Sequence, residues 1–383
     1  MPEMLEARRH LHQHPELSFQ EQETADYLCK WLDQWGISYQ RNIAGHGIFA
    51  KITGSRPGKN RIIALRADMD ALPIQEQTQL EFQSTSKGVM HACGHDIHMT
   101  SLLGTAFLLQ QMRHEYSGTI LLLFQPGEEQ IPGGARQMLE AGVFAEYQPE
   151  LVIGQHVLPE MEAGKAGFKA GMFMASSDEI YITLKGKGGH AALPHLLDDT
   201  VSAAAHVIVN LQQVVSRKSP AYIPSVLSFG KVIANGANNI IPDEVSIAGT
   251  FRTMNEDWRA EAKELIRSIA VKTAESMGVR CDVNILDGYP FLVNDEKATH
   301  GSMNIARDFL GDTNVEELHI RMTAEDFAYF SQAYPSVFYR LGTRKPGSSD
   351  FYPLHSSRFE VDESSIETGI GLMTYLALQQ LAQ

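Results

Sequence analysis

The sequence predicts an α/β fold built as two domains, for three reasons. The chain has 383 residues, which is more than a single hydrophobic core usually supports. Apolar runs of strand length alternate with helical stretches, as in a sheet covered by helices on both faces. The pattern changes near residue 177 and resumes near residue 291. We therefore expect one domain from residues 1–177 and 291–383, with a second domain, residues 178–290, inserted into it.

The first domain is predicted from apolar runs that end in polar residues. The strand-like runs are RIIALRADMD, GTILLLFQPGEE, ELVIGQHV and, after the insertion, SVFYRLG. The helical stretches cover residues 3–14, 20–35, 97–115, 135–141, 297–309 and 363–381. Because strands and helices alternate, this pattern predicts a parallel sheet.

The inserted domain has a different order of elements. Strands are expected over residues 179–185, 225–233, 244–252 and 279–286, and helices over residues 199–215 and 256–277. This order, βαββαβ, is that of the ferredoxin-like unit. Its length of roughly a hundred residues is typical of a compact domain.

The composition limits the partners and the compartment. Hydrophobic residues make up 43 % of the chain and the formal net charge is −14, so nucleic acid and anionic membranes would be repelled. A small molecule or a cation suits this charge better. Cys29, Cys93 and Cys281 are too few and too far apart for a disulfide framework. The N-terminal residues are too charged for a signal peptide and no apolar run could cross a membrane, so we expect a cytoplasmic protein.

Polar side chains follow three of the predicted strands. Asp68 and Asp70 come after the first strand, Glu128 and Glu129 after the second, and His156 after the third. The carboxyl ends of strands form the ligand crevice in open α/β sheets, so these side chains could converge there although the sequence separates them.

The stretch MHACGHDIHM precedes a predicted helix near the same edge of the sheet. Gly94 allows a tight turn, so Cys93 and His95 could face one point. Thiolate, imidazole and carboxylate together suit zinc or another first-row divalent ion. Cys93 could instead be a nucleophile with His95 as its base, or the cluster could simply be buried. The adjacent pair Glu128 and Glu129 favours a metal site, since one carboxylate could bind the metal while the other takes a proton.

At these residues the chain resembles a known family, the amidohydrolase branch of the carboxypeptidase and aminoacylase metallopeptidases. This branch includes hippurate hydrolases, N-acyl-amino-acid deacylases and indole-acetyl-amino-acid hydrolases. The resemblance covers essentially the whole chain and rests on RRHLHQHPELSFQE, RADMDALP, MHACGHDIHM, QPGEE, GQHVLP, GKGGHAALPH, GANNIIPD, TAEDFAYF and LHSSRF. It implies a zinc-exopeptidase-like α/β catalytic domain with a mixed central sheet, and an inserted ferredoxin-like α+β domain that serves as lid and dimerisation surface.

The resemblance also implies which residues form the site. Two divalent metal ions per subunit, which could be zinc, manganese, cobalt or nickel, would be held by Cys93, His95, Glu129, His156 and His355, with Cys93 shared. Glu128 would be the general base, and Asp70 would orient a ligand. In the inserted domain, His190 would stabilise the oxyanion, often across a dimer. Asn239 and Arg252 would contact the carboxylate or carbonyl of the substrate.

Several other candidate ligands are expected to have structural roles. Asp96 and His98 are the uncertain members of MHACGHDIHM, and a structural role is preferred for His98. Packing, capping or core positions are expected for His10, His12, His14, His195, Cys29 and Cys281.

The expected reaction is hydrolysis of an N-acyl amino acid, such as an N-acetyl or N-benzoyl compound, to a carboxylic acid and a free amino acid. Water activated between the two metals would be the attacking group. A metallo-exopeptidase or dipeptidase on the same scaffold is the close alternative. A cysteine amidase using Cys93 would not need Glu129, His156 and His355, and a binding protein without catalysis would not need Glu128. The expected partners are such a substrate or a short peptide, and further copies of the chain in a homodimer or higher oligomer.

Overall fold

The computed structural model describes residues 1–383, which fold as two compact units. Unit 1 comprises Met1–Phe173, Val293–Ile320 and Asp326–Gln383. Unit 2 comprises Met174–Leu292 and Arg321–Glu325. None of the helices combines the length and the apolar character that crossing a membrane requires.

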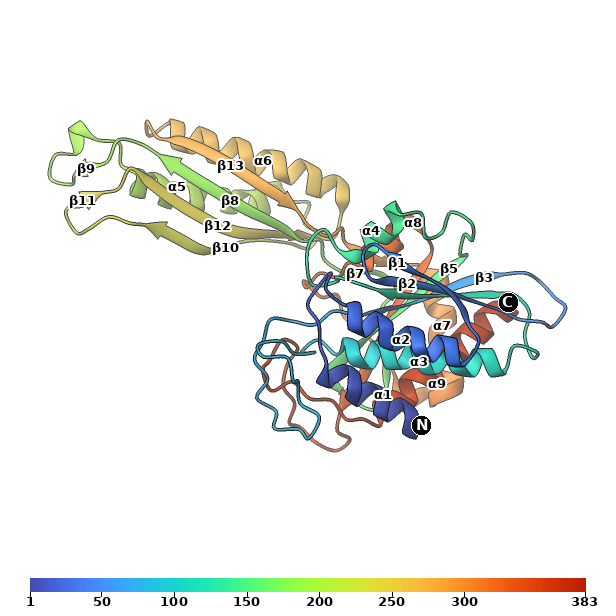
Figure 1. The fold of residues 1–383 in the computed structure, drawn as a ribbon. Helices are drawn as coiled ribbons and strands as arrows, with labels where there is room; N and C mark the ends of the chain where they lie inside the picture. Colours follow the sequence, from blue (N-terminus) through green and yellow to red (C-terminus); the bar gives the residue numbers. More distant parts are fainter. The chain divides into compact units, whose positions relative to one another are not determined.

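Unit 1 is built on an eight-stranded sheet in the order β1-β2-β4-β3-β5-β16-β6-β15 (Figure 1). The strands are β1 (Ser38–Ile43), β2 (Gly47–Thr53), β3 (Ile62–Asp68), β4 (Thr119–Gln125), β5 (Leu151–Glu162), β6 (Ala166–Phe168), β15 (Val315–Glu317) and β16 (Ser336–Arg344). A separate two-stranded sheet pairs β7 (Gly171–Met174) with β14 (Leu292–Asn294).

The sheet of unit 1 is mixed. Strands β4, β3, β5 and β16 run parallel, whereas β1 pairs antiparallel with β2, β2 with β4, and β6 with β16. The last strand, β15, pairs parallel with β6. The prediction of a parallel sheet from the alternating pattern is therefore wrong at the edges, because β1 and β2 are joined by a short hairpin turn and such a connection reverses the chain. The α/β class with a mixed central sheet, implied by the family resemblance, is confirmed.

Helices cover both faces of this sheet. Figure 1 shows α2, α3 and α9 along one face and α4 and α8 toward the other. The helices of unit 1 are α1 (Pro2–Gln13), α2 (Gln22–Gln34), α3 (His95–Gln111), α4 (Gly134–Glu140), α7 (Glu296–Leu310), α8 (Ala328–Ala333) and α9 (Ser365–Ala382). One-turn helices lie at Asp312–Asn314 in this unit and at Pro194–Leu196 in unit 2.

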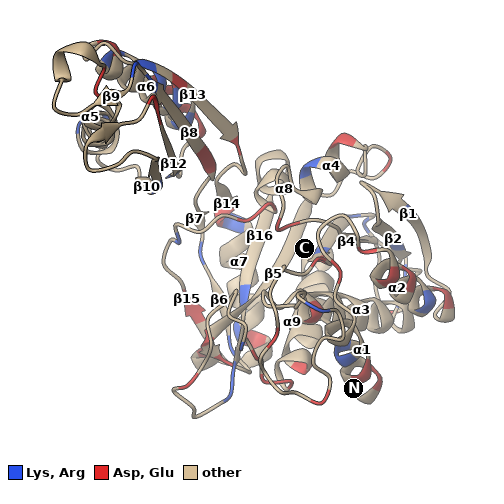
Figure 2. Ribbon diagram, turned by 60° about the vertical axis from the view of Figure 1, so that its left-hand side comes forward, with Lys and Arg blue, Asp and Glu red and all other residues tan.

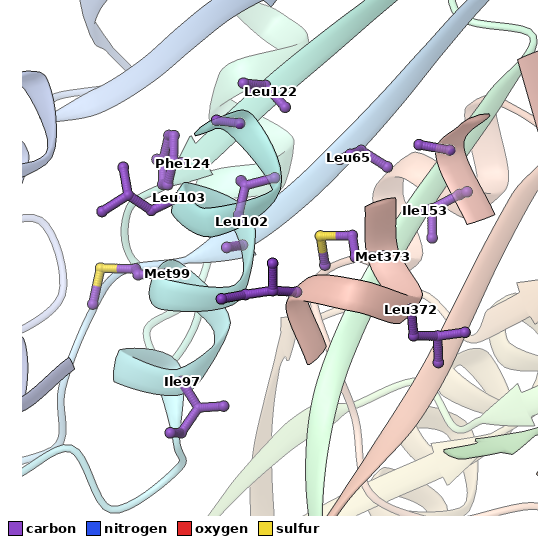
Figure 3. Packing of buried hydrophobic residues seen from close by; sticks show 14 of the residues in the cluster. Leu65, Ile97, Met99, Leu102, Leu103, Leu122, Phe124, Ile153, Leu372 and Met373 are labelled. Atoms are coloured by element: carbon purple, nitrogen blue, oxygen red, sulfur yellow. The ribbon is translucent and has the colours of Figure 1, made fainter. Parts of the chain in front are cut away.

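Helix α3 is buried around most of its circumference, because it packs between the sheet and the helices α1 and α9. Figure 3 shows Leu103 beside Phe124 of β4, with Leu372 and Met373 of α9 on another side. A Cβ atom on Gly104 would lie 2.4 Å from Cδ1 of Ile370, so the glycine permits the close approach of α9. This packing fixes the first turn of α3, which begins at His95, next to the ends of the central strands.

Unit 2 has the element order βαββαβ, as predicted. Its elements are β8 (Asp178–Lys185), α5 (Thr200–Gln213), β10 (Ser225–Ala234), β12 (Glu244–Thr253), α6 (Glu256–Glu275) and β13 (Arg280–Asp287), and a π-helical turn at Val214–Lys218 extends α5. The sheet order is β10-β12-β8-β13 with every pair antiparallel. A small ribbon pairs β9 (Gly189–His190) with β11 (Ile240–Ile241). Helix α6 buries residues such as Trp258 and Ile266 and carries charges of both signs on its outer side (Figure 2).

Candidate metal centre

The candidate ligands gather where MHACGHDIHM turns into α3. Gly94 has φ of +81°, and a Cβ atom there would lie 2.5 Å from Cγ2 of Val157, so only glycine fits this turn. The turn places Cys93 and His95 beside β5. His156 lies within β5 and not at its end, because the strand continues to Glu162.

Two groups of possible ligands share one thiol. The ligand atoms of Cys93, His95 and His156 lie within 4.8 Å of one another, and so do those of Cys93, Glu129 and His355. The Sγ atom of Cys93 is 3.4 Å from Nε2 of His156. The Nε2 atom of His355 is 3.3 Å from Oε1 of Glu129. The structure thus brings together all five residues that the family resemblance implies, with Cys93 common to both groups.

Backbone hydrogen bonds hold Nδ1 of two histidines and leave Nε2 of each beside another candidate ligand. Nδ1 of His95 donates to the backbone oxygen of Asp70 at 2.8 Å, and Nδ1 of His156 donates to that of Val157 at 2.8 Å. Metal-binding histidines are oriented in this way by a bond to the second nitrogen. Nε2 of His95 and Oε1 of Glu129 are buried without a hydrogen-bond partner. Buried polar atoms of this kind need a partner, so the residues present fit a metal ion.

The electrostatics of the centre also favour a cation. Burial raises the pKa of the Cys93 thiol well above its usual range, and the carboxylates of Glu129 and Glu128 raise it further. Burial alone would lower the pKa of His95, but Asp68 and Asp70 outweigh it and raise this pKa to about 10. These shifts show an excess of negative charge around the thiol. A thiolate at Cys93 therefore needs a cation beside it, which a metal ion would supply.

Asp70 contacts two of the candidate ligands. Its Oδ1 lies 3.2 Å from Nδ1 of His95, and its Oδ2 accepts a hydrogen bond from the backbone N–H of Glu129 at 2.8 Å. Asp70 is buried and lies just after β3. It is therefore in a position to orient both residues.

A buried ion network supports Glu128 and was not predicted. Arg66, in the middle of β3, donates to Oδ2 of Asp68 at 2.5 Å and to Oδ1 of Asp326 at 2.8 Å. The backbone N–H of Asp326 in turn donates to Oε1 of Glu128 at 3.3 Å. Two signals could have indicated this network. An arginine interrupts the apolar run RIIALRAD, and TAEDFAYF is one of the family motifs.

Neither uncertain member of MHACGHDIHM has a free ligand atom directed at the centre. Nδ1 of His98 donates to Asp68 at 2.5 Å and its Nε2 accepts from the backbone N–H of Val157 at 2.9 Å, so both nitrogens are occupied. Asp96 pairs with Arg8 at 3.0 Å and with His12 at 2.9 Å. Both residues therefore have the contacts of structural residues.

The other histidines expected to be structural lie apart from the ligand groups. His12 bridges Asp96 and Glu76 in a buried cluster. His10 stacks on Tyr27 and lies beside His14, and His195 is exposed in a one-turn helix. Cys29 and Cys281 are buried in the cores of unit 1 and unit 2, respectively.

The three residues of unit 2 that are candidates for substrate contact lie in two separate places. His190 and Asn239 adjoin each other on the β9–β11 ribbon, where the N–H of Ala191 donates to the carbonyl of Asn239. The ribbon lies at the Glu244 end of β12. Arg252 lies eight residues along that strand from Glu244, about 27 Å at 3.4 Å per residue. One substrate molecule could not contact both places within a single unit 2.

Substitutions of the two histidines of α3 should separate a ligand from a structural residue. We expect His95→Ala to lose at least one of two bound metal ions, whereas His98→Ala should keep both and lower the melting temperature, because it removes two buried hydrogen bonds. Elemental analysis of the folded, gel-filtered proteins measures the metal content. Equal metal loss in the two variants would contradict this assignment.

Comparisons with known proteins agree with this geometry. Residues 64–379 match the model of peptidase family M20/M25/M40. The chain is 38 % identical to N-acetyldiaminopimelate deacetylase of Bacillus subtilis, with 97 % of each chain covered. It is 36 % identical to IAA-amino acid hydrolase ILR1-like 4 of Arabidopsis thaliana, covering 99 % of this chain and 86 % of that one.

A solved structure has the same fold. The Bacillus subtilis YXEP protein, described as a dinuclear metal binding peptidase from the M20 family, superimposes with a TM-score of 0.83 at 34 % identity, covering 100 % of this chain and 98 % of that one. The predicted family, the enzyme class and the two-metal cofactor of that class are therefore confirmed. This chain belongs to peptidase family M20/M25/M40 and is a metal-dependent amidohydrolase.

Proposed function

We propose that this protein hydrolyses N-acyl amino acids to a carboxylic acid and a free amino acid, with Glu128 as the general base. The observation that carries the proposal is the convergence of Cys93, His95, Glu129, His156 and His355 beside Glu128, whose carboxylate is buried and held by a backbone N–H. The names of the relatives support the substrate class, since one is a deacetylase of an acetylated amino acid and another acts on amino-acid conjugates.

Glu128 would move the proton in this reaction. When bound, the two metal ions would supply Lewis acidity that polarises the scissile carbonyl and makes water more acidic. Glu128 takes a proton from the attacking water and later gives it to the leaving amine. The N–H of Asp326 holds one oxygen of Glu128, so the carboxylate keeps a fixed orientation through both transfers. Asp70 holds the neighbouring Glu129 through its backbone N–H.

Arg252 would recognise the carboxylate of the amino-acid part. One of its terminal nitrogens is buried without a hydrogen-bond partner, and burial lowers the pKa of its guanidinium. A substrate carboxylate would supply the missing hydrogen bond and a negative charge in addition to that of the nearby Asp178. Substrates that lack this carboxylate should therefore bind more weakly.

His190 and Asn239 would serve the site of a second subunit in a homodimer. His190 is exposed, and its Nδ1 accepts the N–H of Ala192 at 3.1 Å, so the ring proton is on Nε2. An exposed N–H donor of this kind suits an oxyanion. Its separation from Arg252 along β12 supports contributions to different sites.

A panel of substrates tests the proposed reaction. We expect release of free amino acids from N-acetyl and N-benzoyl amino acids by protein loaded with zinc, manganese, cobalt or nickel, and no release after removal of metal by a chelator. Acyl amines without a carboxylate, the matched controls for Arg252, should have a KM raised at least about tenfold, corresponding to a lost charged hydrogen bond. Cleavage limited to dipeptides with free amino ends would instead support the exopeptidase alternative.

Glu128→Gln tests the base. The amide cannot accept the proton, so kcat should fall by about 10²- to 10⁴-fold while the metal content stays unchanged. Glu140→Gln, at an exposed glutamate in α4, is the control and should behave like the wild type. Turnover near the wild-type value in Glu128→Gln would remove Glu128 from this role.

Mixing two inactive variants tests the contribution of His190 to a partner subunit. His190→Ala and Glu128→Gln should each be inactive alone, but a mixed dimer combines one intact Glu128 site with an intact His190 from the other chain. After unfolding and refolding an equal mixture, we expect about a quarter of wild-type activity, since half of the dimers are mixed and each has one complete site. No recovery in a mixture shown to contain mixed dimers would place His190 in the site of its own chain.

A further inference from the structure

The residues between α1 and α2 lie against the turn that carries Glu128. Residues 18–21, here called the supporting segment, include Ser18 and Glu21, whose exposed fractions are 9 % and 0 %. Phe19 has φ of +63°, in the left-handed region that a bulky residue rarely adopts. Its N–H donates to Oε1 of Glu21 at 2.9 Å. A strained conformation of this kind persists only where its surroundings hold it, which suggests that the segment has a role.

Ser18 contacts the carboxylate that joins two candidate ligands. Its Oγ donates to Oδ2 of Asp70 at 2.6 Å. The same oxygen accepts the N–H of Glu129, and the other oxygen of Asp70 faces His95. Ser18 therefore helps to fix the orientation of Asp70 through the same oxygen that accepts the N–H of Glu129.

Glu21 holds the backbone next to the proposed base. Its Oε1 accepts the N–H of Gly127 at 2.8 Å, in addition to the N–H of Phe19. Burial and the nearby Asp70 raise the pKa of Glu21 to about 7. A glutamine keeps the accepting oxygen and has nearly the same shape, so it is a close replacement for these two hydrogen bonds.

Phe19 fills the space beside Gly127. Gly127 has φ of +60°, and a Cβ atom on it would lie 2.4 Å from Cε1 and Cζ of the Phe19 ring. On its other side the carbonyl of Gly127 accepts the N–H of Gly134 at 3.0 Å. The turn is thus held between the supporting segment and the start of α4, and it has no room for a side chain.

We propose that the supporting segment is a positioning element that fixes the turn Gly127–Glu129, and through it the carboxylates of Glu128 and Glu129. This inference rests on the proposed function in that it assigns the segment to the proton-transfer step. Ser18, Phe19 and Glu21 touch neither substrate nor metal, and they act through Asp70 and Gly127. Loss of the hydrogen bonds of Ser18 or Glu21 should lower kcat much more than it raises KM, because substrate binding relies on other residues.

Substitutions of Glu21 provide the first test. We expect Glu21→Ala to lower kcat for an N-acetyl amino acid by about tenfold to a hundredfold, as for a small displacement of a reacting group, with KM changed less than about threefold. Glu21→Gln should restore kcat to within about threefold of the wild type. Equal losses in both variants, or a kcat of Glu21→Ala near the wild-type value, would overturn the proposal.

A pair of substitutions tests the contact between Phe19 and Gly127. Gly127→Ala should lower kcat about tenfold or more, and the double variant Phe19→Ala/Gly127→Ala should recover most of this loss because the ring no longer occupies the space. Gly36→Ala is the matched control for backbone strain, since Gly36 has φ of +65° but nothing within 4 Å of the added Cβ. It should leave kcat unchanged. A double variant no better than Gly127→Ala would contradict the proposal.

The absorption spectrum of the cobalt-loaded protein keeps this test separate from the proposed reaction. Cobalt(II) bound by thiolate and carboxylate absorbs visible light according to the arrangement of its ligands, with or without a substrate. Gly127→Ala should change this spectrum, the double variant should restore it, and Gly36→Ala should not affect it. If the wild type hydrolyses no N-acyl amino acid, the proposed function fails, yet the spectrum still decides the role of the segment. An unchanged spectrum in Gly127→Ala together with an unchanged kcat would overturn the inference.

Discussion

The candidate metal centre depends on one constraint: several carboxylates are buried close together, away from water. Asp68 and Glu128 are both buried, Asp68 as the last residue of β3 and Glu128 shortly after the end of the neighbouring strand β4. Burying unpaired charges costs several kcal/mol for each ion. Arg66 offsets part of this charge, because its fully buried guanidinium bonds to Asp68 and Asp326. The charge left around Cys93 is what a pair of divalent cations would balance, so metal binding and the stability of this part of the sheet should be linked.

The N-terminal residues also pair buried charges, at the first turn of α3. Arg8 and His12 of α1 both contact Asp96, and His12 also contacts Glu76. Every one of these side chains is buried. Together with the supporting segment, they make the start of the chain a scaffold for the first turn of α3 and for the turn that carries Glu128. The early motif RRHLHQHPELSFQE is therefore connected to the centre although it offers no ligand.

The long elements could be predicted from the sequence because burial requires a continuous or periodic pattern of apolar residues in them. Strand β4 (Thr119–Gln125) is buried at every residue, and its run TILLLF is accordingly almost entirely apolar. The edge strand β1 was missed because SYQRNI is largely exposed and polar, and its pairing depends on the neighbouring strand more than on its own side chains. Arg66 and Asp326 were missed as partners because they lie 260 residues apart in the chain. Their pairing follows only from the order of the strands in the sheet.

The three histidines of MHACGHDIHM show that spacing in the sequence indicates candidate ligands but does not distinguish which of them binds a metal. All three are buried, so burial does not distinguish His91, His95 and His98. His95 has one nitrogen fixed by a backbone oxygen and the other free, as a ligand requires. His98 has both nitrogens occupied. Neither nitrogen of His91 has a hydrogen-bond partner, and burial lowers its pKa to about 4. The difference between His95 and His98 arises from Asp70, Asp68 and Val157, which contact the stretch only after folding. No local pattern of the ten residues contains it.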